Sequence, residues 1–350
     1  MSEQASDQIR VMIVDDSQAY RNLLRHELAL DPRIEVVSVA ANGRLALPRI
    51  NHYRPDFVIL DLEMPEMDGL ATLEVVKKKW PDTRVVMFSS HTVEGARLTL
   101  RALELGAIDF VPKPTGLLDV SGYLRNTLIK RIKDLARTKT QPVPVVPAPT
   151  EVSLREEVGQ ADICAIGIST GGPNALRELL ARITPPLRGP IVIVQHMPPL
   201  FTKHLAETLS YHTRLTVVEA SDGMRLEAGM VVIAPGGSHL ELVRGAGAII
   251  ARTNDRPPEL SCKPSVNILF RSVALEFGNR ALALIMTGMG EDGYEGVRDI
   301  RNRGGFVYAQ SPESCVVFGM PERPIREHLA LPRDIPGLAF SVQSRLGMVK

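Results

Sequence analysis

Three side chains in the second half of the sequence have the types needed for nucleophilic acyl transfer. Ser169 is the centre of a Gly-x-Ser-x-Gly run at residues 167–171, directly after an apolar segment. This spacing turns a strand sharply into a helix, exposes the hydroxyl and gathers backbone N–H groups that stabilise an oxyanion. A glycine-rich strand–helix turn also suits a bound phosphate, so the serine run alone leaves both chemistries open.

A base and an acid follow two other apolar runs. His196 comes two residues after the run 191–194, where it is placed to accept the proton of Ser169. Asp292 lies among three glycines after a later run, and its neighbour Glu291 is the competing candidate for the acid that orients the imidazole. Serine, histidine and aspartate at three strand ends can serve as the nucleophile, the base and the orienting acid of a hydrolytic triad. Their order in the chain differs from the order in α/β-hydrolases.

A second constellation, in the first half, suits phosphate. Asp15 and Asp16 follow the first apolar run and Asp61 follows the third, so adjacent parallel strands would bring three carboxylates to one sheet edge. Mg²⁺, with carboxylate and water ligands, relieves their mutual repulsion. Ser89 and Lys113 follow two further runs and supply a hydroxyl and an ammonium. Together these groups predict a phosphoryl-transfer site with Asp61 as nucleophile, although any one aspartate alone is ordinary turn or helix-cap chemistry.

The elements that must position these groups are short β-branched runs alternating with helical periods. They lie at residues 11–14, 34–39, 57–60, 85–88 and 108–111, and then at 163–167, 191–194, 215–218, 231–234, 281–286 and 306–308. Strands that alternate with helices predict two α/β units, a five-stranded parallel sheet followed by a doubly wound, mostly parallel sheet. Two runs around Gly245 and Gly247 predict a β-hairpin appended to the second sheet. Functional groups in such sheets collect beyond the carboxyl ends of the strands.

Length and composition fit this division. The chain has 350 residues, which predicts two domains, and 44% hydrophobic with 23% charged residues is typical of a globular protein. Lys and Arg number 41 against 40 Asp and Glu, a balance that argues against a nucleic-acid-binding or membrane-surface protein. The polar N-terminus and the lack of a long apolar run predict a cytoplasmic protein. The three cysteines are predicted to be small buried hydrophobes in a reducing compartment.

A proline-rich stretch separates the two halves. Pro142, Pro144, Pro147 and Pro149 alternate with small apolar residues, a pattern that predicts a semi-rigid, extended spacer. The predicted organisation is therefore a first domain at 8–136, a linker at 137–160 and a second domain at 161–350.

The motifs of the first half resemble the receiver domain of two-component response regulators. They are VDDS at 14–17, DLEMPEMDG at 61–69 and KP at 113–114. The resemblance implies a flavodoxin-like domain that a histidine kinase phosphorylates on Asp61, with Mg²⁺ held by Asp15, Asp16 and Asp61. It also implies that Ser89, Phe110 and Lys113 form the receiver switch, and that the bond between Lys113 and Pro114 is cis.

The second half resembles the chemotaxis protein-glutamate methylesterases, which also carry an N-terminal receiver and a linker. The matching motifs are IGISTGG (166–172), QHMPP (195–199), APGG (234–237), KPSVN (263–267), TGMGEDG (287–293) and VFGMP (317–321). The resemblance implies Ser169 as nucleophile, His196 as base and Asp292 as the orienting acid. It implies an oxyanion hole made by the backbone N–H groups of Met289 and Thr170.

The implied function is a phosphorylation-activated serine hydrolase of chemosensory adaptation. It would remove methyl groups from glutamate γ-methyl esters on chemoreceptor signalling helices and deamidate particular receptor glutamines. Mg²⁺ would serve the receiver alone, and the partners would be the chemoreceptor and a histidine kinase, without nucleic acid and without membrane insertion. A non-enzymatic, receptor-binding adaptor is the rival, and the complete set Ser169, His196 and Asp292 argues against it. Glu291, Asn267 and the pair Cys262-Lys263 depart from the family's pattern. These departures are expected to bear on fine substrate contacts and not on the chemistry, since none of them is expected to touch the triad.

Overall fold

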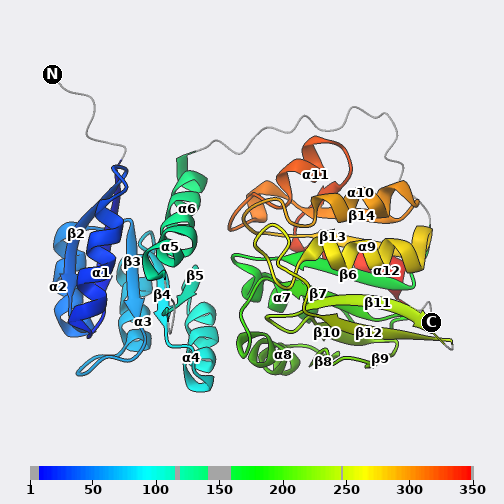
Figure 1. Cartoon of the computed structure of the whole chain (residues 1–350), viewed down its shortest axis with the longest axis horizontal. Coiled ribbons are helices and arrows are strands. Elements are labelled where there is room, and N and C mark those ends of the chain that lie inside the picture. Colours follow the sequence, from blue (N-terminus) through cyan, green and yellow to red (C-terminus); the bar gives the residue numbers. More distant parts are fainter. Residues whose placement is uncertain (1–7, 115–118, 141–158, 246, 348–350) are drawn as a thin grey trace. The chain divides into compact units, whose positions relative to one another are not determined.

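The computed structural model describes residues 8–114, 119–140, 159–245 and 247–347 (Figure 1). The chain divides into two compact units, Met1–Thr140 and Gln141–Lys350. Helix α6 (Lys130–Thr140) runs a few residues beyond the predicted end of the first domain at 136. Most of the predicted linker, residues 141–158, lies outside the described residues. Within the described ranges, no helix is both long enough and apolar enough to cross a membrane.

The first unit is a five-stranded sheet in the order β2-β1-β3-β4-β5, and every pair of neighbours is parallel. Its strands are β1 (Ile9–Val14), β2 (Ile34–Ala40), β3 (Phe57–Asp61), β4 (Arg84–Ser89) and β5 (Asp109–Pro112). Its other helices are α1 (Gln18–Ala29), α2 (Gly43–Tyr53), α3 (Gly69–Lys79), α4 (Val93–Glu104) and α5 (Val120–Leu124), and a π-helical turn (Arg125–Ile129) joins α5 to α6. Helix α1 packs with α5, and α2, α3 and α4 pack in sequence. All five strands predicted from the apolar runs are present.

The second unit is built on a seven-stranded sheet in the order β15-β14-β13-β6-β7-β10-β8. All its neighbouring strands are parallel, as predicted. The strands are β6 (Ile163–Ile168), β7 (Ile191–Gln195), β8 (Thr216–Glu219), β10 (Met230–Ile233), β13 (Ala281–Ile285), β14 (Phe306–Gln310) and β15 (Leu331–Arg333). The four strands β14, β13, β6 and β7 are buried along their whole length, which is why they read as continuous apolar runs.

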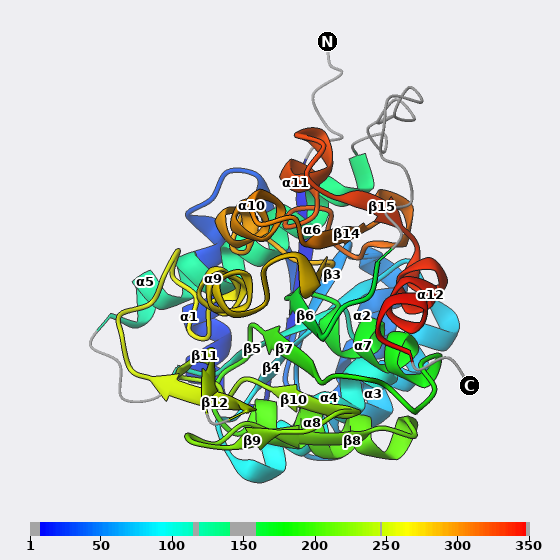
Figure 2. The same cartoon turned by 90° about the vertical axis from the view of Figure 1, so that its right-hand side faces the viewer.

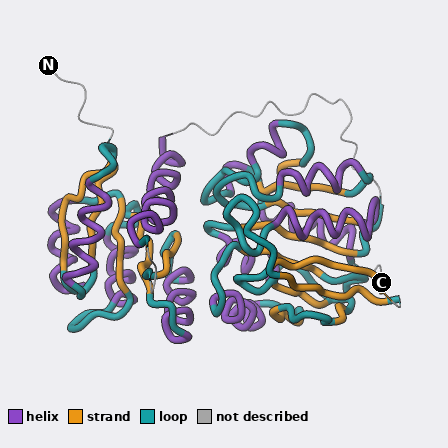
Figure 3. The backbone as a smooth tube through the Cα atoms, in the orientation of Figure 1, coloured by secondary structure: helices purple, strands orange, loops and turns teal. Residues whose placement is uncertain are grey.

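Helices cover both faces of this sheet. Figure 2 shows α9 (Val266–Phe277) and α10 (Tyr294–Asn302) on one side of β6, and α7 (Gly172–Ala181) and α12 (Ile335–Leu346) on the other. Helix α8 (Phe201–His212) packs with α7 and against β8 and β10, and the short α11 (Glu322–Arg326) lies beside α10. Ser169, His196 and Asp292 follow β6, β7 and β13, which are neighbouring parallel strands, and Figure 3 shows the loops at the ends of this sheet.

One prediction about the second sheet needs correction, and one of its strands was not predicted. The hairpin β11 (His239–Gly245) and β12 (Ala248–Asn254) forms as expected, but it pairs with β9 (Arg225–Leu226) in a separate three-stranded sheet. The buried side chains of Leu240, Leu242 and Ala251 join the core, and β11 packs against α9, so the hairpin covers this helix instead of extending the main sheet. Strand β15 was not predicted, because it is only three residues long and carries a proline, which is tolerated at a sheet edge.

Candidate active site

Ser169 opens the turn that joins β6 to α7. Its backbone N–H donates to Thr287 O at 3.0 Å, and its carbonyl accepts from Gly172 N and from the side-chain amide of Gln195, both at 2.9 Å. Gly171 has a φ of +78°, which favours glycine, and a Cβ on Gly172 would lie 1.8 Å from Gln195 Oε1. The turn is therefore fixed by its backbone, and the Ser169 side chain lies in a recess, with the residue 7% exposed.

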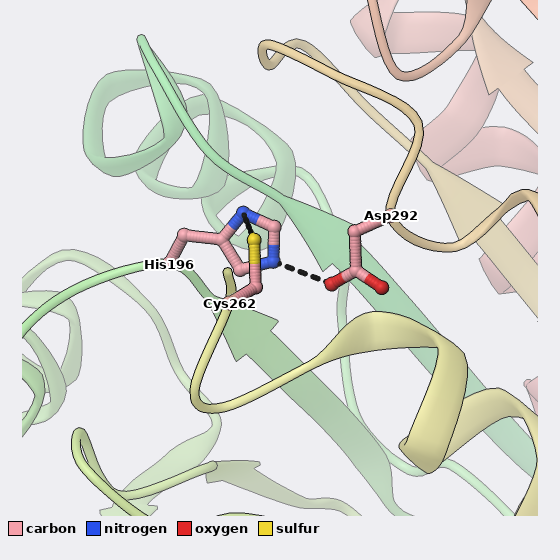
Figure 4. A group of neighbouring side chains, drawn as sticks. All are labelled: His196, Cys262 and Asp292. Atoms are coloured by element: carbon pink, nitrogen blue, oxygen red, sulfur yellow. Dashed lines mark hydrogen bonds and ion pairs between the residues drawn. The ribbon is translucent and has the colours of Figure 1, made fainter. Parts of the chain in front are cut away.

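The base and the acid come from the strands on either side of β6. The neighbours of β6 are β7, which ends just before His196, and β13, which leads to Asp292. His196 Nε2 lies 2.8 Å from Asp292 Oδ2 (Figure 4), so this nitrogen donates to the carboxylate and Nδ1 is left to accept a proton. Among the described residues, no hydrogen bond joins the Ser169 hydroxyl to the imidazole. Such bonds are often loose before a substrate binds.

Cys262 contacts His196 Nδ1, the ring nitrogen that does not bond Asp292. Its Sγ is 3.8 Å from Nδ1 (Figure 4). The prediction that all three cysteines are merely buried hydrophobes fits Cys164 but is wrong for Cys262, which is only partly buried and touches the site. No spacing in the sequence signals this contact, because the loop that carries Cys262 reaches His196 only through the fold.

Asp292 is held at the N-terminus of α9 by donors from Ser265, Val266 and Asn267, a contact that the spacing of these residues in the sequence does not predict. Its Oδ1 accepts from Ser265 Oγ at 2.8 Å and Asn267 N at 3.1 Å, and its Oδ2 accepts from Val266 N at 2.7 Å. Burial alone raises the pKa of the Asp292 carboxyl, but the hydrogen bonds from His196 and the helix N–H groups outweigh it, so its pKa lies below the usual value. The carboxylate is therefore ionised and fixed in orientation.

The competing acid, Glu291, is directed elsewhere. Its side chain is 62% exposed and pairs with Arg323 Nη1 at 3.3 Å. The geometry thus favours Asp292 over Glu291 as the partner of the imidazole.

Asn267 is a buried clamp and not a substrate contact. It is 1% exposed, its Oδ1 accepts from the N–H groups of Gly293 and Gly296, each at 3.0 Å, and its Nδ2 donates to Glu259 Oε1 at 2.9 Å. The expectation that its departure from the family pattern alters fine substrate contacts is wrong for this residue, since a buried side chain with every polar atom engaged cannot reach a substrate.

We expect Ser265→Ala to lower kcat about tenfold, because Asp292 loses one of the two hydrogen bonds to Oδ1 that fix its orientation. The loss also makes the carboxylate more basic, so the acid limb of the pH–rate profile should move to higher pH. Ser272→Ala is the matched control, since this buried hydroxyl on the same helix bonds only Leu269 O and Leu242 N. It should lower stability without moving the profile; equal profiles for the two variants would contradict the assignment.

The pH dependence of the reaction should be set by His196. Burial lowers the pKa of this imidazole, but hydrogen bonds with Asp292 and Cys262 outweigh it and raise the pKa to about 9. Only the neutral ring accepts a proton, so kcat/KM should rise about tenfold per pH unit between pH 7 and 8 and level off only above pH 9. An unperturbed histidine would level off just above neutrality. A pH–rate profile that is already flat at pH 7 would contradict the geometry.

The loop after β13 passes close to Ser169, the predicted nucleophile. A Cβ on Gly288 would lie 2.7 Å from Ser169 Cβ, so glycine is needed for this approach, and the next residue is Met289. Within the described ranges, the Met289 N–H makes no hydrogen bond to another protein group, so it is free to meet an oxyanion. Thr170 is 3% exposed, and its carbonyl accepts from Thr287 Oγ1 at 3.0 Å, which fixes the peptide next to Ser169.

The first unit brings its predicted acid cluster together. One carboxylate oxygen from each of Asp15, Asp16 and Asp61 lies within 4.8 Å of the others. Lys113 Nζ lies 2.9 Å from Asp15 Oδ2 and 2.7 Å from Asp61 Oδ2. Burial raises the pKa of Asp61 to about 6, although Lys113 opposes this rise. Three carboxylates face one ammonium, which leaves an excess of negative charge and of oxygen donors, so the residues fit a divalent cation with oxygen ligands.

The predicted switch residues flank this cluster. Ser89 is fully buried at the end of β4, and its hydroxyl has no hydrogen-bond partner among the described residues. Phe110 is 4% exposed on β5, three residues before Lys113. The expected cis bond between Lys113 and Pro114 is absent. The cis bonds in the described chain are Pro185–Pro186 and Lys263–Pro264, and trans is the lower-energy form for a bond to proline.

Comparison with known proteins gives matches over nearly the whole chain. Residues 164–335 match the CheB methylesterase family, and residues 11–124 match the response regulator receiver domain. A protein-glutamate methylesterase/protein-glutamine glutaminase of Trichodesmium erythraeum is 42% identical over 89% of this chain and 91% of its own length. A protein of the same name from Archaeoglobus fulgidus is 40% identical, covering 91% of this chain and 92% of that protein. The crystal structure of the Thermotoga maritima CheB methylesterase catalytic domain covers 52% of this chain and 97% of that domain, at 37% identity and a TM-score of 0.51.

Proposed function

Because this chain belongs to the CheB methylesterase family and carries a response regulator receiver domain, we propose that Ser169, His196 and Asp292 are its catalytic triad. The activity is hydrolysis of protein glutamate methyl esters and of protein glutamine side-chain amides. The observation that carries the assignment is the 2.8 Å hydrogen bond between His196 and Asp292, placed at the strand end beside the Ser169 turn.

In the proposed mechanism, Ser169 Oγ attacks the γ-carbonyl carbon of a glutamyl methyl ester while His196 Nδ1 accepts the hydroxyl proton. The carbonyl oxygen becomes an oxyanion, which the N–H groups of Met289 and Thr170 stabilise. The tetrahedral intermediate collapses, His196 returns the proton to the leaving methoxide, and methanol departs. Water then attacks the acyl-enzyme with His196 again as base, the imidazolium gives the proton to Ser169 Oγ as it leaves, and the receptor departs with a glutamate side chain. With a glutamine side chain, ammonia is the leaving group of the same reaction.

Asp292 orients the imidazole and stabilises its protonated form. Its four hydrogen bonds leave the carboxylate little freedom, so the ring keeps Nε2 on Asp292 and presents Nδ1. This preorganisation is what a triad acid contributes.

The receiver domain makes the esterase responsive to phosphorylation on Asp61. Asp15, Asp16 and Asp61 would hold Mg²⁺, which when bound neutralises phosphoryl oxygens. Lys113 would pair with the new phosphoryl group, and the Ser89 hydroxyl, which has no partner in the described structure, would hydrogen bond to it. Phe110 would repack when Ser89 moves. A histidine kinase would donate the phosphoryl group, and chemoreceptor helices would be the substrate.

The function is tested by methanol release from membranes that carry methylated receptors. Mass spectrometry of enzyme quenched during turnover should find the glutamyl acyl group on the peptide that contains Ser169. A rival adaptor, which binds receptors without chemistry, would release no methanol and carry no acyl group.

A phosphodonor with Mg²⁺ should raise methanol release by the full chain about tenfold or more. A shift of about 1.4 kcal/mol between a dominant resting form and an active form changes the active population tenfold. Asp61→Asn should abolish the rise and leave the resting rate unchanged. Asp68→Asn, which alters only the exposed N-cap of α3, is the matched control and should keep the rise.

Residues 151–350 alone are expected to be faster than the unphosphorylated full chain. If this fragment folds but is no faster, activation must come from positive effects of the phosphorylated receiver alone.

A further inference from the structure

The loop that brings Cys262 to the base contains an unusual turn. Glu259 N donates to Cys262 O at 3.2 Å and Cys262 N donates to Glu259 O at 2.8 Å, so residues 259–262 form a two-residue hairpin. Its central residues, Leu260 and Ser261, have φ angles of +49° and +65°. Positive φ at both positions is the pattern of a type I′ turn, which takes asparagine and glycine. A leucine there is strained.

The strain at Leu260 brings no gain in folding. The residue is 61% exposed, so it fills no core position. The turn is nevertheless fixed on both sides. Glu259 bonds Asn267 Nδ2 at 2.9 Å and Arg271 Nη1 at 2.7 Å, and Cys262 rests against His196. Strained residues that are held in this way cluster at functional sites.

A second leucine, close to His196 in the chain, repeats this combination of positive φ and exposure. Leu200 lies four residues after His196, has a φ of +72° and is 36% exposed. Among the described residues, six non-glycine residues have positive φ, and Leu200 and Leu260 are the two apolar ones. Leu260 is two residues from Cys262, which contacts His196. Short stretches of chain therefore tie both leucines to the surroundings of His196, and we call Leu200 and Leu260 the rim of the site.

Ser169 and His196 are much less exposed than the two leucines. Ser169 is 7% exposed and the side chain of His196 is 11% exposed, whereas the two leucines project into solvent. A glutamyl ester on a helix must therefore reach down into the site while the body of the helix rests on the rim. Helix residues three or four positions from that glutamyl lie on the same face, about 5–6 Å away, and meet the rim first.

We propose that Leu260, with Leu200, docks apolar side chains that lie three or four positions from the modified glutamyl on the substrate helix. This inference rests on the proposed function, in which the substrate is a chemoreceptor helix. Leu260 is then a specificity residue for the protein substrate and takes no part in the chemistry. The strain in the turn is retained because it holds the leucine outward, beside the base.

Leu260→Asn separates docking from folding, because asparagine tolerates positive φ and lacks the apolar side chain. We expect the Tm of the full chain to rise by roughly 2–4 °C. For methylated receptor membranes, kcat/KM should fall about tenfold, mainly through a higher KM. For a small ester, N-acetyl-glutamate γ-methyl ester, kcat/KM should stay within about twofold of the parent. A structural defect cannot explain a variant whose Tm is higher and whose kcat/KM falls for the receptor substrate alone.

Two controls complete the test. Leu260→Met keeps an apolar side chain at the same φ, so it should keep the receptor kcat/KM and show no rise in Tm. Leu275→Asn removes another exposed leucine, which is 65% exposed on α9, and should leave kcat/KM unchanged for both substrates.

An unchanged receptor kcat/KM in Leu260→Asn would overturn the inference, and so would an equal fall on both substrates, because the turn would then act only through Cys262 and His196. If the parent enzyme hydrolyses the small ester but releases no methanol from receptor membranes, the proposed substrate is wrong. This measurement on the parent comes before any variant is made, so failure of the proposed function is distinguished from failure of the inference about Leu260.

Discussion

Ser169→Ala is expected to lower kcat for methyl-ester hydrolysis by about 10⁶-fold, as for removal of the nucleophile from other serine hydrolases. The hydroxyl is the only atom lost, and the turn around it is held by backbone groups, the Ser169 N–H and carbonyl. The variant should therefore keep its fold and its affinity for receptor. The measurement is methanol release from methylated receptor membranes under single-turnover conditions, together with the Tm.

A matched control is Ser311→Ala, which removes a buried hydroxyl at the end of β14 that bonds Ser314. It should leave kcat unchanged. Methanol release by Ser169→Ala at the parent's rate would exclude Ser169 as the nucleophile, and with it the triad.

Asp292→Asn is expected to lower kcat by about 10⁴-fold, the cost of the same exchange in a serine protease triad. The carboxylate accepts from Ser265 Oγ, Val266 N, Asn267 N and His196 Nε2. An asparagine amide would point its NH₂ group at donors and favour the wrong tautomer of the imidazole, so Nδ1 would no longer accept the serine proton. The same clash costs stability, so kcat is compared at a temperature where circular dichroism shows both proteins folded.

Glu291→Gln is the neighbouring control. Its exposed side chain gives up only the pair with Arg323, an interaction of at most about 1 kcal/mol at the surface, so kcat should stay within about twofold. If Glu291→Gln were inactive while Asp292→Asn kept the parent's rate, the acid would be misassigned by one residue.

The sequence predicted the groups that follow strands, and it missed those that reach the site through loops. Ser169, His196 and Asp61 were predictable because each comes directly after an apolar run, and the carboxyl ends of parallel strands share one sheet edge. Cys262 and Ser265 lie on a loop without periodicity, and their distance from His196 and Asp292 depends on how the hairpin and α9 pack.

The hairpin itself illustrates the same limit. Its two strands were predictable from the sequence around Gly247, but membership of a sheet is decided by which surface its apolar side chains cover. Leu240 and Leu242 pack into the core with β11 lying against α9, and this long-range choice leaves no local signal.

The place of β13 between β14 and β6 sets the order in which a newly made chain can become an enzyme. The strands β6, β7, β8 and β10 leave the ribosome first and can pair with one another, but β6 then remains an open edge until β13 is made. Asp292 emerges only after β13, so a nascent chain that already displays Ser169 and His196 has no orienting acid. Chains that end before residue 281 should thus be inert and prone to edge-to-edge association. Pairing of β13 with β6 covers the open edge of β6, and the loop after β13 brings in Asp292, so esterase activity can appear only in chains that extend beyond this loop. Strand β13 is then the edge of the sheet until β14 pairs with it.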